Sequence, residues 1–370
     1  MRVGINVAVL SSPLTGVGYY ALYLLRALVR VGEDFEWVFI GVDPSKKLAP
    51  SGERVQHFPA SKLTGIRRVL WQQLVLPRLA SQSRVDVLHC PDFSRPLRVG
   101  TPVVNTIHDL TFLDPQSPIP FVKRNYKKSL AQFAITHSAR IIAVSEFTRS
   151  EILRRFAIDE SRVTVIHNGF EAGQPSGPDL ASEVPGSGRR SPYLLFVSTL
   201  ERRKNAARLV QAFSYLKVKR RIPHRLVLVG QKGWGWAEIR RAIEASPVAH
   251  EVELPGYLPR EEVLRLYRNA DVFIYPSVYE GFGFPVLEAM AAGTPVACSR
   301  VASLPEVAGE AAEFFDPYSV EDMAAALERV LESPERQAEL RRKGAERVRH
   351  FSWEECARRH CQVYKEVFEG

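Results

Sequence analysis

Two glutamates, Glu280 and Glu288, lie eight positions apart in the chain, with Gly281 and Gly283 between them. Glycine lets a backbone come close to a ligand. Pro285 suits the first turn of a helix, where its missing N–H costs nothing, so this stretch reads as a loop that opens a helix. Two carboxylates and free backbone N–H groups then point at one small volume. Because carboxylates bind hydroxyl groups well, the pair is typical of a sugar site.

Each glutamate also has an ordinary interpretation. Glu280 can be a turn residue, and Glu288 can simply favour the dipole at the start of its helix. For Glu288 taken alone that interpretation is the better one. For the pair, placed directly after the apolar strand expected at Ala270–Pro276, we favour the sugar site.

A cluster of cations, Arg202, Arg203 and Lys204, follows another expected strand, Tyr193–Val197. Cations at the start of a helix oppose its dipole, so the cluster is either a solvated surface or a site for an anion. Arginine grips phosphate with two hydrogen bonds and lysine acts as a point charge. A diphosphate is therefore the ligand that this cluster indicates.

Two weaker candidates lie in the first half of the chain. Gly16 and Gly18 join the first strand to the first helix, where backbone N–H groups can bind phosphate, although glycines also simply make turns. His108 ends the strand expected at Val103–Ile107 and could bond a sugar hydroxyl, but a lone histidine is more often structural. Asp109 is expected to orient His108 or its loop.

Apolar strands alternate with helical patterns through the first half, which favours an α/β fold with parallel sheets covered on both faces. The expected strands are Val3–Leu10, Trp37–Val42, Val55–Pro59, Val85–His89, Val103–Ile107, Ile141–Val144 and Val163–Ile166. The expected helices are Gly18–Val31, Ile66–Leu79, Phe121–His137 and Glu146–Phe156.

The same alternation continues after a Pro-, Gly- and Ser-rich segment that we interpret as a linker, residues 172–192. The strands expected there are Tyr193–Val197, Leu226–Val229, Val252–Leu254, Val272–Tyr275 and Pro295–Cys298, with helices beginning near Asn205, Trp236, Arg260 and Pro285. Two domains are therefore expected, residues 1–171 and 193–352. Ser352 offers an N-cap for a last helix, 353–370.

Bulk properties exclude several classes of protein. The 370 residues are 45% hydrophobic and 25% charged, as in a globular protein too long for one compact core. No apolar run approaches the ~20 residues that span a bilayer, and no secretory leader is evident, so a cytoplasmic protein is expected. The four cysteines have no C-x-x-C spacing, so we expect reduced thiols and no zinc site.

The net charge of +9 comes entirely from the first half of the chain. Residues 1–170 carry 22 Lys and Arg against 13 Asp and Glu, whereas residues 171–370 carry 28 of each kind. The segments Arg54–Val85 and Pro115–Ser145 have no acidic residue. This surplus is either a solvated basic face or a surface for an anionic membrane or acceptor. Nucleic acid is not expected, since no DNA- or RNA-binding motif is present.

Taken together, these motifs resemble those of the retaining nucleotide-sugar glycosyltransferases of family 4, over nearly the whole chain. The resemblance implies the GT-B architecture, two Rossmann-like domains facing across a cleft, with the last helix packed back on the first domain. It places the donor mainly on the second domain and the acceptor on the first. No Asp-x-Asp metal motif is evident and no cofactor is implied, so we expect no essential metal.

The resemblance also implies a role for each candidate. His108, Arg203, Lys204 and Glu280 are expected to be catalytic, with Arg203 and Lys204 on the donor diphosphate and Glu280 on the donor sugar. Ser198 stands where the family usually has glycine, and Thr199 where many members have arginine, so diphosphate binding should depend more on Arg203 and Lys204. The remaining donor-binding positions are expected to be Gly16, Gly18, Leu258, Phe282, Gly283, Phe284 and Glu288.

The function that follows is transfer of a hexose from a nucleotide diphosphate sugar to a hydroxyl of a glycan or lipid-linked saccharide. The segments Tyr193–Asn205 and His108–Leu110 look most like those of bacterial mannosyltransferases that use GDP-mannose. A UDP-sugar such as UDP-glucose is the alternative donor, and a non-catalytic sugar-nucleotide-binding protein is the alternative class. Retention with attack from the leaving-group face is implied. A glycosidase-like mechanism with Glu280 as acid and Glu288 as nucleophile is the rival.

Overall fold

The structure is a computed structural model, and it describes residues 1–11, 16–42, 50–60, 63, 65–93, 95–113, 121–171 and 192–370. The chain divides into two compact units. Unit 1 is Met1–Gly169 together with Phe351–Gly370, and unit 2 is Phe170–His350. Almost all of the expected linker, residues 172–191, lies outside the described residues.

Unit 1 is built on a parallel sheet in the order β3-β2-β1-β4-β5-β6-β7. Strands β4 and β5 in its middle are buried throughout, as expected for a sheet covered on both faces. The chain changes direction across the sheet between β1 and β4, and ligands bind near such a switch point at the carboxyl ends of the strands. The strands are β1 (Arg2–Asn6), β2 (Glu36–Val42), β3 (Val55–Pro59), β4 (Val87–Cys90), β5 (Val103–Ile107), β6 (Arg140–Ala143) and β7 (Val163–Val165).

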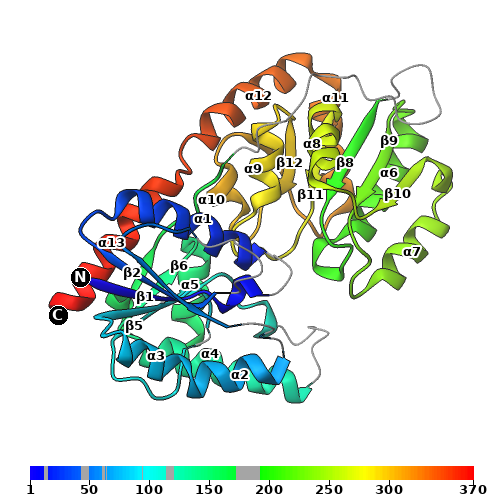
Figure 1. Ribbon diagram of the computed structural model, residues 1–370. Helices are drawn as coiled ribbons and strands as arrows, with labels where there is room; N and C mark the ends of the chain where they lie inside the picture. The colour runs from blue at the N-terminus through cyan, green and yellow to red at the C-terminus, as the bar shows by residue number, and fades with distance from the viewer. Residues whose placement is uncertain are drawn as a thin grey trace. The chain divides into compact units, whose positions relative to one another are not determined.

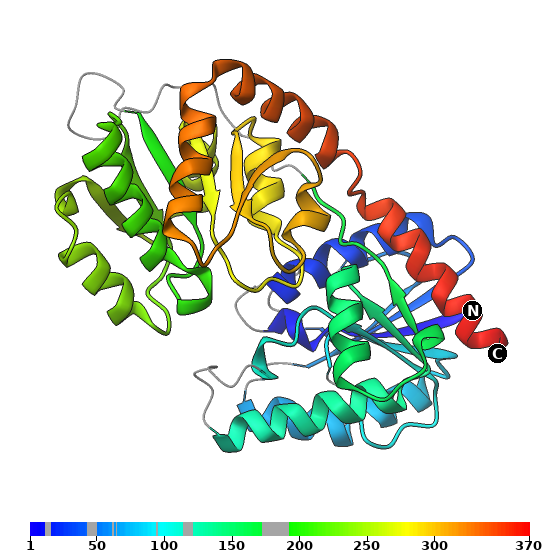
Figure 2. The ribbon, with the colours of Figure 1, turned by 180° about the vertical axis from the view of Figure 1, so that it is seen from behind.

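Helices cover both faces of this sheet. On one face, α1 (Gly16–Val31) and α13 (Trp353–Glu369) lie side by side, one from each end of the chain (Figures 1 and 2). The Trp353 ring stacks on Tyr23 of α1, with centroids 5.7 Å apart. The other helices of the unit are α2 (Gly65–Leu74), α3 (Leu76–Gln82), α4 (Phe121–His137) and α5 (Glu146–Arg155), with short 3-10 turns at η1 (Ala8–Ser11), η2 (Thr111–Leu113) and η3 (Glu160–Arg162).

Unit 2 has its own parallel sheet, in the order β10-β9-β8-β11-β12-β13, with the switch point between β8 and β11. Figures 1 and 2 show α8 and α9 on one face of it and α6 and α11 on the other. The strands are β8 (Tyr193–Val197), β9 (Arg225–Val229), β10 (Val252–Gly256), β11 (Val272–Tyr275), β12 (Val296–Ser299) and β13 (Ala312–Phe315). The helices are η4 (Arg202–Lys204), α6 (Ala206–Arg220), α7 (Trp236–Glu244), η5 (Ala249–Glu251), α8 (Arg260–Asn269), α9 (Phe284–Ala291), α10 (Leu304–Ala308), α11 (Val320–Glu332) and α12 (Pro334–Val348).

Two predicted elements were wrong in extent. The first strand ends at Asn6 and not at Leu10, because Asn6 Oδ1 accepts from the Ala8 N–H at 3.2 Å and turns the backbone into η1. The helix predicted over Ile66–Leu79 is two helices, α2 and α3. Pro77 has no N–H to bond one turn back, so a single continuous helix cannot form there.

Strand β13 was not predicted, since its sequence is short and its burial is mixed. The α/β class, the parallel sheets and the helix over Phe121–His137 are confirmed. The N-cap at Ser352 is also confirmed: its hydroxyl accepts from the Glu355 N–H at 3.3 Å. In the described part of the chain, none of the helices is both long enough and apolar enough to cross a bilayer.

Candidate functional site

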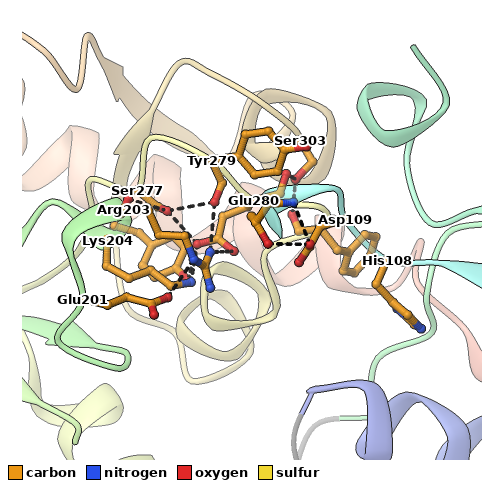
Figure 3. Close-up of polar contacts among 12 residues, drawn as sticks. His108, Asp109, Glu201, Arg203, Lys204, Ser277, Tyr279, Glu280 and Ser303 are labelled. Atoms are coloured by element: carbon orange, nitrogen blue, oxygen red, sulfur yellow. Dashed lines mark hydrogen bonds and ion pairs between the residues drawn. The ribbon is translucent and has the colours of Figure 1, made fainter. Parts of the chain in front are cut away.

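The switch point of unit 2 brings three of the candidate residues together. Arg203 and Lys204 follow β8, and Glu280 follows β11, which pairs with β8 in parallel. Because the carboxyl ends of paired parallel strands meet at one edge of the sheet, residues 76 positions apart in the chain become neighbours. Figure 3 shows Arg203 and Lys204 directed at the Glu280 carboxylate.

The two oxygens of Glu280 are used unequally. Oε1 accepts hydrogen bonds from Lys204 Nζ, from the Tyr275 hydroxyl at 2.9 Å and from Ser277 Oγ at 2.6 Å. From the described residues, Oε2 accepts only the bond from Arg203 Nη1, at 3.2 Å. Each carboxylate oxygen has roughly two acceptor positions, so Oε2, which accepts one bond, can accept another from a ligand hydroxyl.

Electrostatics keep Glu280 ionised. Burial alone would raise the pKa of this carboxyl, but the positive charges of Lys204 and Arg203 and the hydrogen bonds from Lys204 and Ser277 lower that pKa to about 2. Lys204 is itself buried, at 6% exposure, so each charge is stable because the other is present. Burial lowers the pKa of the Lys204 ammonium, and the neighbouring Glu280 charge opposes that shift, so the two charges support each other at the edge of the sheet.

Asn205 holds the loop that carries Lys204. Its backbone is left-handed, at φ +61°, and it ends η4 where α6 begins. Its Nδ2 donates to the carbonyls of Pro276, at 3.1 Å, and Pro317, at 2.7 Å. The Val278 N–H also donates to the Arg203 carbonyl at 2.9 Å. The loops after β8 and β11 are thus tied together backbone to backbone.

Arg203 lies nearer to solvent than Lys204, with a third of its side chain exposed. Its Nε lies 2.7 Å from Glu201 Oε1, and its Nη1 donates to the Tyr279 carbonyl at 3.0 Å. The guanidinium is therefore oriented between two carboxylates at the rim of the site. A ligand anion can reach Arg203 more easily than Lys204.

The sequence analysis missed three residues that hold Glu280, namely Tyr275, Ser277 and Ser303. Ser303 Oγ lies 2.9 Å from the Glu280 carbonyl and 2.7 Å from that of Phe282, and it fastens the loop from the side of α10. The available signal was position: Tyr275 ends the buried strand β11, five residues before Glu280, and Ser277 follows that strand, three residues before Glu280. Nothing in the sequence marks Ser303.

Phe282, Gly283 and Phe284 form the turn into α9. Gly283 has φ +120°, a conformation that favours glycine, and a Cβ there would lie 2.8 Å from Leu304 Cδ2, whose side chain would have to shift. The Phe282 ring is buried and meets Phe284 edge-on, with centroids 5.2 Å apart. The turn is therefore a rigid support for the backbone N–H groups at the start of α9.

Glu288 lies on α9 and does not join the Glu280 cluster. Its Oε1 accepts from Arg260 Nη1 at 3.1 Å and its Oε2 from the Tyr267 hydroxyl at 3.3 Å, both on α8. Burial raises the pKa of Glu288, and Arg260 only partly opposes this. The two glutamates thus differ in chemistry, one a fixed anion and the other a carboxyl with raised pKa. Leu258, another predicted donor contact, is half-buried in the loop before α8.

The candidates of unit 1 lie at the carboxyl ends of its own strands. His108 follows β5, and its Nε2 donates to the Pro91 carbonyl at 2.8 Å, because a carbonyl can only accept. Burial lowers the pKa of His108, so the ring is neutral and its Nδ1 is an acceptor. Asp109 Oδ1 accepts from the N–H and the hydroxyl of Thr111, at 3.0 and 2.7 Å, and so orients the loop.

Gly16 and Gly18 form the first turn of α1. Gly16 is exposed, and a Cβ there would meet no atom of the described residues within 4 Å. Gly18 is buried. Tyr20, one turn further along, meets the His108 ring edge-on, with centroids 4.6 Å apart. The glycine turn and His108 are thus neighbours in unit 1 through Tyr20.

Two protein families match the two halves of the chain. Residues 14–174 match the family described as Glycosyltransferase Family 4, and residues 180–347 match Glycosyl transferases group 1. The chain is 31% identical to the O-antigen chain mannosyltransferase B of Escherichia coli over 369 residues, which cover 95% of this chain and 96% of that protein. It is 30% identical to the MMP alpha-(1->4)-mannosyltransferase of Mycolicibacterium hassiacum over 284 residues, 73% of this chain and 66% of that one.

Solved structures share the fold. The chain superposes on Anabaena Alr3699/HepE, crystallised in complex with UDP and glucose, with a TM-score of 0.72 at 17% identity, over 99% of this chain and 100% of that one. This similarity, together with the two parallel sheets, shows the GT-B fold.

Proposed function

The chain belongs to the glycosyltransferases of family 4 and group 1, and we propose that this hexosyltransferase moves mannose from GDP-mannose to a hydroxyl of a glycan or lipid-linked saccharide. Both relatives described above are named mannosyltransferases, which supports mannose as the sugar. The observation that carries the proposal is the ionised Glu280 carboxylate, clamped by Lys204 and Arg203 but with Oε2 open to a hydroxyl donor.

In the proposed complex, Glu280 Oε2 accepts a hydrogen bond from a hydroxyl of the donor sugar. Arg203 and Lys204 bind the diphosphate. Lys204 Nζ donates two of its three N–H groups to the Tyr275 hydroxyl and the Glu280 carboxylate, and the third donates to phosphate. Glu288 binds the ribose, and the loop at Leu258 lies beside the base. His108 Nδ1 accepts from a sugar hydroxyl, and the amides at Gly16 and Gly18 face the diphosphate.

The barrier to transfer is the negative charge that develops on the departing diphosphate. Fixed cations stabilise that charge in the transition state, and Arg203 and Lys204 are such cations. We propose retention, with the acceptor hydroxyl attacking from the leaving-group face and the diphosphate taking its proton. The glycosidase-like mechanism, with Glu280 as acid and Glu288 as nucleophile, is the weaker candidate. A carboxyl with a pKa of about 2 is ionised near neutral pH and has no proton to donate as a general acid.

A UDP-sugar donor is the second candidate. It is supported by the similarity to HepE, whose structure holds UDP and glucose. The family's chemistry at Glu280, Arg203 and Lys204 is the same for either donor, so the base and the sugar must be found by experiment.

Binding and transfer assays separate these donors. GDP, UDP and ADP are first compared by thermal shift, and GDP-mannose and UDP-glucose are then incubated with candidate acceptor saccharides. The proposal expects the largest stabilisation from GDP, consumption of GDP-mannose and an α-linked product whose anomeric proton is identified by NMR. Stabilisation by UDP alone, with transfer from UDP-glucose, would replace the GDP-mannose assignment.

The acceptor is proposed to approach unit 1, which carries the positive charge of the chain. An acceptor linked to lipid would be presented at an anionic membrane, where each near-surface cation adds ~1 kcal/mol to binding at low salt. We therefore propose a cytoplasmic enzyme with peripheral contact at the inner face of the cell membrane. A soluble acceptor with a solvated basic face is the alternative.

A further inference from the structure

The loop after β9 presents two tryptophans at the carboxyl edge of the sheet in unit 2. Trp234 is 40% exposed, and Trp236 is partly exposed where it begins α7. Tryptophan is among the largest apolar side chains and is highly buried on average. Two tryptophans exposed within one loop therefore mark a surface that can contact a ligand.

Backbone contacts hold this loop in one conformation. Hydrogen bonds of 2.8 to 3.0 Å join it to the loop after β8, and one of them runs from the Arg202 N–H to the Trp234 carbonyl. Gly235, with φ +84°, packs so closely that a Cβ there would lie 2.8 Å from Arg202 Cβ. The indole rings are therefore carried on a fixed backbone, and a ligand does not have to order the loop when it binds.

A cation lies over each indole ring. Arg202 Cζ is 5.6 Å from the centroid of the Trp234 ring, and Lys232 Nζ is 4.8 Å from that of Trp236. The ring quadrupole attracts these cations, so they orient the rings and place N–H donors beside them. Glu238 adds a carboxylate, with Oε2 3.3 Å from Arg202 Nε, and its side chain remains 40% exposed. Aromatic faces, donors and an acceptor thus meet at one exposed place.

This combination matches a neutral saccharide. A pyranose ring has an apolar face of C–H groups that packs against an aromatic ring, and a rim of hydroxyls that both donate and accept hydrogen bonds. The guanidinium, ammonium and indole N–H groups can donate to those hydroxyls, and the Glu238 carboxylate can accept from them. An anionic membrane matches less well, because that carboxylate lies among the cations and offsets part of their charge.

We propose that this part of unit 2 is a binding surface for a neutral oligosaccharide, and we call it the tryptophan surface. It consists of Arg202, Lys232, Trp234, Trp236 and Glu238. It adjoins the candidate donor site, because Arg202 precedes Arg203, whose Nη1 lies 3.2 Å from Glu280 Oε2. The binding requires no transfer reaction. Only its purpose, to hold a glycan acceptor near the donor, rests on the proposed function.

The test is saturation-transfer NMR of the full chain with two neutral tetrasaccharides, α-linked mannotetraose and maltotetraose, so that the result does not depend on the sugar of the donor. At least one of them should bind. Trp234→Ala should weaken that binding about fivefold or more, because the stacking surface is lost. Trp234→Phe keeps an aromatic ring and should weaken it less than about threefold.

Tyr318→Ala is the matched control and should change the affinity less than about twofold. Tyr318 is 61% exposed and has Arg208 Cζ 5.7 Å from its ring centroid, but it follows β13, at the far edge of the sheet. In the wild type, titration should also shift the indole N–H signal of Trp234, which is assigned by its loss in Trp234→Phe. The signal of Trp37, which is 1% exposed in unit 1, should not shift.

Absence of binding by both tetrasaccharides, or a loss in Trp234→Ala no larger than that in Tyr318→Ala, would overturn the proposal. An equal loss of affinity for the nucleoside diphosphate in Trp234→Ala would also overturn it, because the loop would then belong to the donor site. Trp234-dependent sedimentation with vesicles of phosphatidylglycerol in phosphatidylcholine, without saccharide binding, would replace the proposal by a membrane contact. No transfer reaction is measured, so a failure of the glycosyltransferase assay and a failure here are separate results.

Discussion

The hydroxyl of Tyr20 on α1 lies 2.9 Å from Nε2 of His360 on α13, 340 residues later in the chain. The same hydroxyl lies 3.0 Å from Thr106 Oγ1 on β5, the strand that leads to His108. The last helix is therefore fastened, through one buried phenol, to the strand and the histidine ring of the candidate site in unit 1.

The protons of this buried network can be assigned from one fixed point. His360 Nδ1 lies 2.7 Å from the Cys356 carbonyl and must donate to it, so Nε2 accepts from Tyr20. Tyr20 must then accept from Thr106, and Thr106 from His89 Nε2 at 2.9 Å. His89 Nδ1 is left to accept from the Tyr364 hydroxyl at 2.7 Å. With both histidines neutral, every bond of the network is therefore made.

Stability should therefore fall as the pH falls below about 6.5. Burial lowers the pKa of His360 to about 4 and that of His89 well below its usual value, and the nearby Arg359 and His108 lower the pKa of His360 further. The unfolded chain binds these protons first, so the stabilisation is complete above pH 6.5 and is lost toward pH 4. For His360 alone the loss is about 3 kcal/mol.

Urea unfolding at pH 7.5, 6.5, 5.5 and 4.5 measures this loss, with His360→Gln as the variant that cannot titrate. The variant should be less stable at pH 7.5 but change less with pH. The Glu280 carboxyl, whose pKa is lowered, loses its contribution only in a lower window, between about 4.5 and 2. Equal stability of the wild type at pH 7.5 and 4.5 would show that the network does not control folding.

Lys204 and Glu280 should depend on each other for stability. Lys204→Met leaves the buried Glu280 carboxylate without its main counter-charge and should cost about 3–5 kcal/mol. The double variant Lys204→Met/Glu280→Gln removes both charges. Its loss of unfolding free energy should be smaller, by about 1 kcal/mol or more, than the summed losses of the two single variants, which is a usual coupling energy for buried neighbours. Denaturant titration of the four proteins gives the cycle, and simple additivity would contradict the pairing.

Arg203→Ala should separate phosphate binding from base binding. Its guanidinium is accessible at the rim, and a charge-assisted hydrogen bond contributes about 1.5–3 kcal/mol, so affinity for GDP should fall roughly tenfold or more while guanosine binding stays nearly constant. Calorimetry with both ligands provides the measurement. Arg202→Ala is the control, because Arg202 contacts Glu238 at 3.3 Å and the Trp234 ring instead of Glu280. Equal weakening of GDP and guanosine would place Arg203 away from the diphosphate.

Gly230 should tolerate no side chain. Its φ is +145°, and a Cβ there would lie 1.9 Å from the Ser198 carbonyl oxygen, in the loop that leads to the Arg203 cluster. Gly230→Ala should cost about 3 kcal/mol or more, since both backbone strain and the clash must be relieved. Gly256→Ala is the control: its φ is +80°, but no atom of the described chain lies within 4 Å of the added Cβ, so only about 1 kcal/mol is expected. Comparable melting temperatures for the two variants would refute this account.

The local pattern of the sequence was sufficient to predict most of the strands and helices and to recognise the family resemblance. Alternating apolar strands and helices are short-range signals, so β5, β8, β11 and α4 were predicted at their observed bounds. The spacing of Glu280, Gly281 and Gly283 before a proline is likewise local. Errors arose where a single side chain redirects the backbone, as Asn6 does at the end of β1.

The contacts that define the site were decided by the tertiary structure. Strand order cannot be read from periodicity, and only the pairing of β8 with β11 brings Lys204 to Glu280. The structure also separated the two glutamates, because α8 supplies Arg260 and Tyr267 to Glu288 alone. The enclosure of Glu280 by Tyr275 and Ser277, and the bond from Tyr20 to His360, depend in the same way on packing between elements distant in sequence. Local propensities act within a few residues, whereas these contacts form only when whole strands and helices are assembled.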